Sequence, residues 1–145
     1  MSTVVVLGTF DTKGEELNAL SELIRGRGFK TLLVDVGSGK PAVPVDVTAG
    51  EIAERVGQDW RSVLARQDRG EWVALIARAV AVFLPDLQKN NLISGVVSLG
   101  GGGGTAIATA GMRALPIGFP KVMVSTLASG NVAPYVGTVD IVMMP

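Results

Sequence analysis

The chain has 145 residues, the length of one ordinary domain. Its 13 basic and 13 acidic side chains balance, so composition favours neither a nucleic-acid nor a membrane partner. It has no cysteine and no histidine, which excludes disulfides, thiolate or imidazole metal sites and histidine general bases. No apolar stretch approaches the roughly 18 residues of a membrane span. No secretory signal begins the sequence, so we expect a cytoplasmic protein.

Five short apolar runs are expected to form strands. They lie at residues 4–7, 31–36, 93–99, 122–124 and 139–143. Each is apolar at odd and even positions, which is typical of a parallel sheet covered on both faces. Helical segments separate the runs, which predicts a Rossmann-like three-layer α/β/α sandwich with a mainly parallel sheet of about five strands. We expect residues 1–145 to be a single subdomain, the N-terminal fragment of a longer two-subdomain protein.

The first expected helix follows the strand at residues 4–7. Leu17, Leu20 and Ile24 recur at helical spacing, and Thr12 and Glu15 have the spacing of a capping box. The sequence therefore predicts a helix that has Thr12 as its N-cap.

The same capping spacing recurs at Thr48 and at Asp68. It predicts a short helix after Thr48 and a long helix, residues 71 to about 88, after Asp68. Pro85 is expected to kink or end the long helix. Residues 71–84 are apolar almost all the way round, which indicates burial against a partner. We therefore expect a homo-oligomer that forms through this helix.

The strongest motif is the run of five glycines from Gly100 to Gly104, between the strand at 93–99 and an expected helix at 106–115. Bare backbone N–H groups at a helix N-terminus suit an anion, because the helix dipole favours negative charge there. A flexible turn is the alternative, but ordering five glycines has a large entropic cost. The run fits the dinucleotide pattern GxGxxG/A by construction, so it favours NAD only weakly, and no Walker A motif is present.

A second motif lies in the loop after the first strand. Lys13 is suited to neutralise phosphate, Thr9 and Thr12 to donate hydroxyl hydrogen bonds, and Asp11 to hold Mg²⁺ directly or through water. The alternative is that Asp11 and Thr12 are ordinary cap residues. The position of the loop at the carboxyl end of a strand favours binding.

Two weaker signals follow the other strands. Residues 125–131, SerThrLeuAlaSerGlyAsn, have small hydroxyl groups that suit a phosphate or ribose, although a Ser/Gly turn explains them equally well. Asp35 ends the second strand, where an acid in such folds accepts hydrogen bonds from ribose hydroxyls. Capping of the next loop is the alternative role for Asp35.

Two blocks carry a family resemblance. GTFDTKGEEL at residues 8–17 and the segment at 101–145 resemble uncharacterised protein family 0261, which includes the ATP-binding N-terminal domain of a plant tobamovirus-resistance protein. The resemblance covers the whole chain and implies an ATP-binding region of two Rossmann-like subdomains, of which this chain matches the first. By position it implies contacts to ATP and Mg²⁺ from Thr9, Asp11, Thr12, Lys13, Gly101, Gly102, Gly103, Gly104, Thr105, Ser125, Thr126, Ser129 and Gly130.

The leading hypothesis is the N-terminal half of an ATP-binding protein, with Mg²⁺ at Asp11 and a missing C-terminal subdomain that completes the cleft. No residue stands out as a base for a reaction, so the sequence leaves open whether the protein is an enzyme. The alternatives are a non-catalytic dimerisation or regulatory module and an NAD- or sugar-phosphate-binding Rossmann domain.

Overall fold

The computed structural model describes residues 2–145, which alternate between strands and helices. In chain order the elements are β1 (Thr3–Gly8), α1 (Phe10–Arg25), β2 (Lys30–Asp35), α2 (Ala49–Arg55), α3 (Trp60–Ala65), α4 (Arg69–Lys89), β3 (Gly95–Gly100), α5 (Gly102–Arg113), β4 (Lys121–Ser125), the 3₁₀ helix η1 (Thr126–Ser129), α6 (Ala133–Val136) and β5 (Val142–Met144). The expected alternation is confirmed, while α3, η1 and α6 are elements that the sequence analysis did not predict.

The five strands form one parallel sheet in the order β2-β1-β3-β4-β5. Val5 of β1 pairs with Leu32 on one side and with Val96 on the other. The chain goes outward from β1 to β2, then crosses back to β3 on the opposite side of β1. In such a doubly wound sheet the switch between β1 and β3 opens a crevice at the carboxyl ends of the strands.

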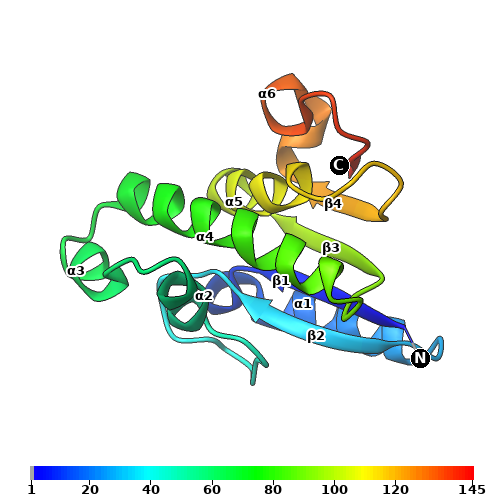
Figure 1. Ribbon diagram of the computed structural model, residues 1–145, viewed down its shortest axis with the longest axis horizontal. Coiled ribbons are helices and arrows are strands. Elements are labelled where there is room, and N and C mark those ends of the chain that lie inside the picture. The colour runs from blue at the N-terminus through cyan, green and yellow to red at the C-terminus, as the bar shows by residue number, and fades with distance from the viewer. Residues whose placement is uncertain (1) are drawn as a thin grey trace.

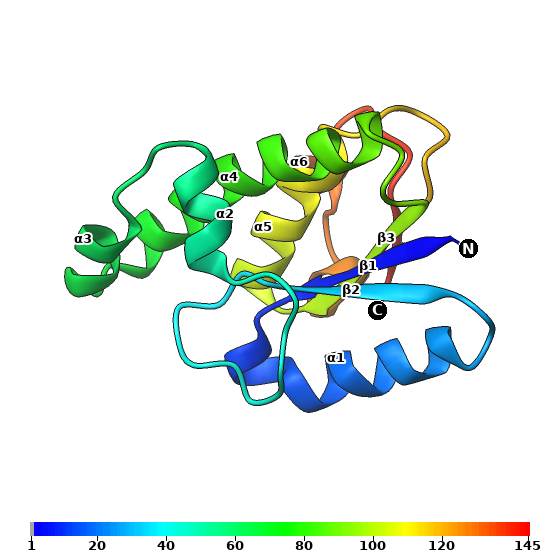
Figure 2. The same ribbon diagram turned by 60° about the horizontal axis from the view of Figure 1, so that its bottom comes forward.

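Helices cover both faces of the sheet, with α1 on one face and α2, α4 and α5 on the other (Figures 1 and 2). Successive residues of β1 serve the two faces. Val5 and Leu7 join the large core under α4 and α5, whereas Val6 packs with Phe10 and Leu17 of α1. This alternation explains why the strands are apolar at every position. The predicted Rossmann-like three-layer α/β/α sandwich is therefore confirmed.

Most of the apolar surface of α4 is buried within the chain, although Val82 on this helix is 53% exposed. The partner of α4 is α5, and the two helices approach closely because residue 111 is glycine: a Cβ atom added at Gly111 would overlap Val80 Cγ1 and lie 2.7 Å from Leu84 Cδ1. The helix ends at Lys89, close to the expected end near residue 88, and it passes through Pro85, so this proline does not end it. Most of residues 71–84 thus pack against α5 and the sheet of the same chain, and a homo-oligomer formed through this helix stays a prediction.

The start of α1 differs from the sequence prediction. The N-cap is Thr9, not Thr12, and the helix begins at Phe10, with helical geometry interrupted at Lys13. The N–H of Phe10 donates to Asp35 Oδ1 over 3.0 Å, so an acid far along the chain does the work expected of the local capping box. Caps at Thr48 and Asp68 are confirmed: each side chain accepts the backbone N–H three residues later.

The last strand begins later than expected. Residues 139–141 follow a turn at residues 137–138 and lie outside the strand, and only Val142–Met144 pair with β4. Asp140 turns away to accept from the ammonium of Lys121, which is 2.7 Å away and has a fully buried side chain. The buried cation fixes the preceding turn and so delays the strand.

The outer edge of β2 is covered by the segment at residues 45–47. Val47 bonds to β2 through its N–H to Leu33 O, 3.1 Å, and through its carbonyl to Asp35 N, 2.9 Å. The Asp46 carboxylate accepts the N–H of Leu33 over 2.7 Å. The edge strand therefore has backbone partners on its outer side.

Candidate functional site

The main cavity lies at the carboxyl ends of β1 and β3, where the topology opens a crevice. Its volume is about 670 Å³, within the range of small-molecule sites. Three walls, together with residues 36–38 after β2, line it: the β1–α1 junction, the first turn of α5, and the α3–α4 segment. It brings together eight residues that the sequence singled out: Thr9, Asp11, Thr12, Lys13, Gly101, Gly102, Gly103 and Gly104.

The glycines that line the cavity, residues 101–104, form the start of helix α5 and not a separate loop. α5 begins at Gly102, four residues earlier than expected, and its N-cap Gly101 makes no side-chain hydrogen bond. The first intrahelical hydrogen bond of the turn is from Thr105 N to Gly101 O, 2.9 Å. By helix geometry the N–H groups before it have no carbonyl partner within the helix. The turn thus presents a set of N–H donors and a positive dipole end to the cavity.

Space beside these glycines is open. A Cβ atom at Gly102 would have no heavy atom within 4 Å, and one at Gly104 would have only Thr9 Cγ2, at 4.0 Å. At Gly103 the nearest atom is Arg69 Nη2, 3.4 Å away, at the end of a flexible side chain. The fold would therefore accept alanine here, and the space is available to a ligand that approaches the backbone closely.

The β1–α1 wall supplies side chains instead of bare backbone. The hydroxyls of Thr9 and Thr12 are hydrogen-bonded to each other over 2.7 Å. Asp11 accepts the N–H of Gly39 at Oδ2, 3.1 Å, whereas its Oδ1 is buried without a hydrogen-bond partner among residues 2–145. A buried oxygen of this kind calls for a donor or a cation, because leaving it unpaired is unfavourable.

Asp35 is a structural link next to the cavity rather than part of its wall. It is 2% exposed, and its Oδ1 accepts the N–H groups of Phe10, 3.0 Å, and Gly37, 2.9 Å. Burial raises the pKa of this carboxyl above its ordinary value; the two backbone N–H groups lower it, and the negative charge of Asp11 adds to the rise. Asp35 lines only the smaller adjoining pocket.

The third loop lies beside the glycine turn but outside the cavity. The buried hydroxyls of Thr105 and Ser125 bond to each other over 2.6 Å, and Ser125 Oγ also accepts the N–H of Leu127, 3.0 Å. They are thus engaged within the fold. Thr126, Ser129 and Gly130 in η1 and after it do not line the cavity either. The sequence-predicted contacts from this loop remain predictions that the cavity does not support.

The opposite wall was missed by the sequence analysis. It consists of apolar side chains from α3 and α4, with Trp72 placed by a hydrogen bond from its indole Nε1 to Val36 O, 3.2 Å. Gln67, in the left-handed region at φ 54°, turns the chain between the two helices. Arg69 also belongs to this wall. The α3 residues had no sequence signal because α3 itself was not predicted, whereas Trp72 and Val73 lie on the predicted long helix, whose apolar residues were expected to pack and not to line a site.

The cavity contains one carboxylate that fits a metal ion. Among residues 2–145 no group of three or more His, Cys, Asp or Glu side chains could hold one. Mg²⁺ is commonly bound by one or two carboxylates together with water and substrate phosphates. The unpartnered Oδ1 of Asp11 fits that arrangement, in which the ligand supplies the remaining oxygens.

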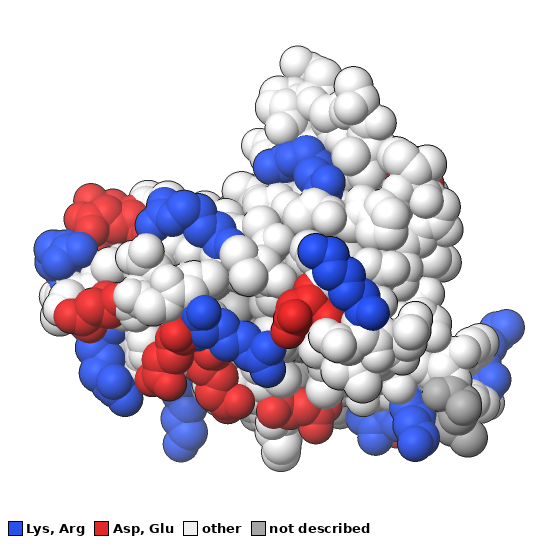
Figure 3. Space-filling model, viewed as in Figure 1, with Lys and Arg blue, Asp and Glu red and all other residues white. Residues whose placement is uncertain are grey.

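Charges of both signs alternate over α2, α3 and α4, and the region over α6 carries few (Figure 3). A ligand that approaches this face meets no broad basic surface, so the positive groups at the cavity act locally. No helix within residues 2–145 is both long and apolar enough to span a bilayer.

Comparisons with known proteins agree with the sequence resemblance. Residues 2–145 match the model described as the N-terminal domain of uncharacterised protein family UPF0261. A UPF0261 protein of Rhizobium meliloti is 50% identical over 145 residues, which are all of this chain and 36% of that protein. One from Clostridium tetani is 42% identical over 142 residues, 97% of this chain and 35% of the relative.

A plant protein is among the relatives. The ToMV susceptible protein of tomato, Solanum lycopersicum, is 33% identical over 164 residues, which cover 98% of this chain and 21% of the tomato protein. The chain thus spans about a third or less of the length of these relatives.

Proposed function

This chain belongs to uncharacterised protein family UPF0261, and on that premise we propose that it binds ATP, with the phosphates at the first turn of α5. The observation that carries the proposal is the uncapped glycine turn, whose N–H groups face a cavity that also holds Lys13. Charge-assisted hydrogen bonds from backbone N–H groups to phosphate are short and strong. The same turn would not need glycine for the fold alone.

The β1–α1 wall supports the proposal with charge and hydroxyl groups. Lys13 supplies a cation to the same cavity as the N–H groups, and the paired hydroxyls of Thr9 and Thr12 can each turn to a phosphate oxygen. Asp11 would hold Mg²⁺ through its unpartnered oxygen. When bound, the metal supplies positive charge to the phosphate oxygens, while the chain's own residues bind and orient the nucleotide.

The apolar wall supports a nucleoside as the other part of the ligand. Val63, Leu64, Trp72 and Val73 face the cavity from α3 and α4, opposite the polar β1–α1 wall. A pocket with one polar, cation-bearing side and one apolar side suits a molecule with a phosphate end and an aromatic base. An inorganic anion alone would leave the apolar wall without a partner.

Calorimetric titration with Mg·ATP tests the proposal. We expect saturable binding that is tighter than that of adenosine and weakened by salt, because phosphate contacts are screened by added ions. Full-length Rhizobium meliloti relative, titrated in parallel, reports what the remaining two thirds of such a protein add. No binding of Mg·ATP by either protein would contradict the proposal.

Two rival functions give different results in the same assay. An NAD- or sugar-phosphate-binding domain would bind NAD at least as tightly as ATP. A non-catalytic regulatory module would bind ATP and return it intact, which prolonged incubation of the full-length relative with Mg·ATP and measurement of ADP would reveal. Release of ADP at a rate above the uncatalysed control would instead indicate an enzyme.

A further inference from the structure

Arg69 lies at the N-terminus of α4, directly beside the glycine turn of α5. Its Nη2 and Nε would be 3.4 Å and 3.7 Å from a Cβ atom added at Gly103, and Val73 Cγ2 would be at 3.5 Å. Arg69 and Lys13 both line the main cavity, but they come from different walls: α4 and the β1–α1 junction. Two cations thus flank one set of backbone N–H donors.

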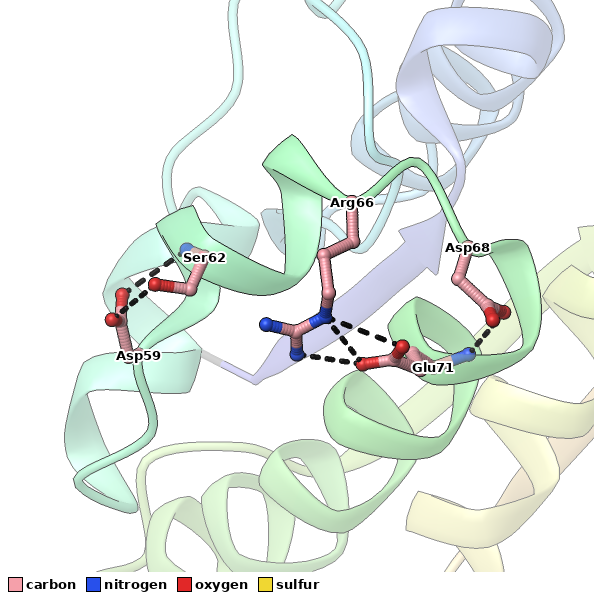
Figure 4. Close-up of polar contacts among 5 residues, drawn as sticks. All are labelled: Asp59, Ser62, Arg66, Asp68 and Glu71. Carbon is pink, nitrogen blue, oxygen red and sulfur yellow. Dashed lines mark hydrogen bonds and ion pairs between the residues drawn. The ribbon is translucent and has the colours of Figure 1, made fainter.

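Three acidic side chains of the α3–α4 segment have partners other than Arg69 (Figure 4). Asp68 caps α4 by accepting the N–H of Glu71, 3.1 Å. The Glu71 carboxylate is held by Arg66, with Nη2 and Nε at 2.6 Å and 3.0 Å from Oε2. Asp59 caps α3 through the N–H and hydroxyl of Ser62, at 3.2 Å and 2.5 Å. These contacts fix the segment without using Arg69.

Arg69 itself has no ion pair and no side-chain hydrogen bond within the described chain, residues 2–145. A guanidinium that lines a cavity and touches no carboxylate is available to an external anion. Its planar fork can donate two parallel hydrogen bonds to one phosphate, which an ammonium cannot do.

We propose that Arg69 is a phosphate-binding residue that grips the nucleotide from the α4 side, opposite Lys13, and thereby makes the site selective for polyphosphate over the nucleoside. The inference rests on the proposed function and deepens it. Arg69 closes the open side of the glycine turn, so a bound phosphate is enclosed by backbone N–H groups and by cations from two walls. The bond also ties the α3–α4 wall to the ligand.

The test compares Arg69→Gln and Arg69→Lys with Arg78→Gln, a control on the same helix whose exposed guanidinium does not line the cavity. Each protein is titrated with Mg·ATP, inorganic triphosphate and adenosine. Arg69→Gln should weaken Mg·ATP and triphosphate by roughly tenfold or more and leave adenosine unchanged, since a charge-assisted contact is lost. Arg69→Lys should recover part of the affinity, and Arg78→Gln should match the wild type.

The outcomes separate this inference from the proposed function. The melting temperature of Arg69→Gln should equal that of the wild type, because the side chain has no partner in the fold. If Arg69→Gln weakens the binding of adenosine and of Mg·ATP equally, Arg69 contacts the nucleoside and not the phosphates, which would overturn the inference. If Arg69→Gln keeps the wild-type affinity for Mg·ATP while Lys13→Gln binds more weakly, the inference about Arg69 is overturned and the proposed function stands. No Mg·ATP binding by either the wild type or the full-length relative would overturn the proposed function and this inference with it.

Discussion

The glycines at residues 37–39 and those at 101–104 differ in what fills the space beside them. A Cβ atom at Gly37 would overlap Asp11 Oδ1 and lie 2.8 Å from its Cγ, whereas one at Gly102 would have no heavy atom within 4 Å. Glycine in a helix is less stable than alanine by about 0.5–1 kcal/mol. The first set therefore leaves room for the Asp11 side chain, whereas the second lowers stability and borders open space, which we propose that the ligand fills.

Gly37→Ala should show the larger effect on the fold. The methyl group displaces the Asp11 carboxylate and crowds Asp35 Oδ1, 3.2 Å from the added atom. Overpacking of this kind lowers the free energy of unfolding by about 1–3 kcal/mol. Chemical denaturation measures it. A wild-type denaturation midpoint in Gly37→Ala would show that the two glycine sets do not differ.

Lys13→Ala should show the larger effect on binding. We expect Mg·ATP affinity to fall by roughly tenfold to a hundredfold, since a charge-assisted contact contributes about 1.5–3 kcal/mol, with adenosine affinity unchanged. Lys30→Ala is the matched control, because this exposed lysine begins β2 at the opposite end of the sheet. Loss of adenosine affinity to the same degree would contradict a role on phosphate.

Gly102→Ala and Gly104→Ala should each raise the thermal stability of the protein and weaken its binding of Mg·ATP. Each alanine fits, so thermal denaturation should show stabilisation, by about 0.4–1 kcal/mol per residue. Side chains of a first turn tilt toward the helix N-terminus, so the methyl groups enter the anion's space and should weaken Mg·ATP by roughly tenfold. A double variant that is destabilised and binds normally would reverse our interpretation of this glycine set.

Asp35→Asn should have the smallest effect, a change in how the stability of the protein depends on pH. The amide oxygen can still accept from Phe10 and Gly37, so the fold should persist. Because burial raises the pKa of Asp35 in the folded protein above its ordinary 3.8, the native state takes up a proton first as pH falls. Wild type should therefore gain stability relative to Asp35→Asn as pH falls through the raised pKa toward 3.8, and remain constant above it. Melting temperatures across this window check the sign.

The sheet and two walls of the cavity were predictable because their signals are local. Apolar runs identify the strands, and the sequences around Lys13 and Gly102 each follow a strand, so parallel topology brings them to one edge. The fold class and both motifs were therefore within reach of the sequence. Their chemistry toward ATP stays a prediction.

The rest depends on contacts between distant residues. Asp35 caps α1 from 25 residues away, which no capping pattern reveals. Thr105 and Ser125 bond to each other across 20 residues, so hydroxyls expected at a ligand are used inside the fold. Arg69 lines the cavity only because the α3–α4 segment lies beside the carboxyl ends of the strands.

The covered edge of β2 bears on how copies of this protein can meet. Edge strands with free N–H and C=O groups invite pairing with another chain and hence aggregation. Here Asp46 and Val47 already bond to Leu33 and Asp35, and the opposite edge strand, β5, is only three residues long. Intermolecular strand addition, the route to cross-β association, is thereby disfavoured at both edges, and any assembly of copies is expected to rely on side-chain surfaces.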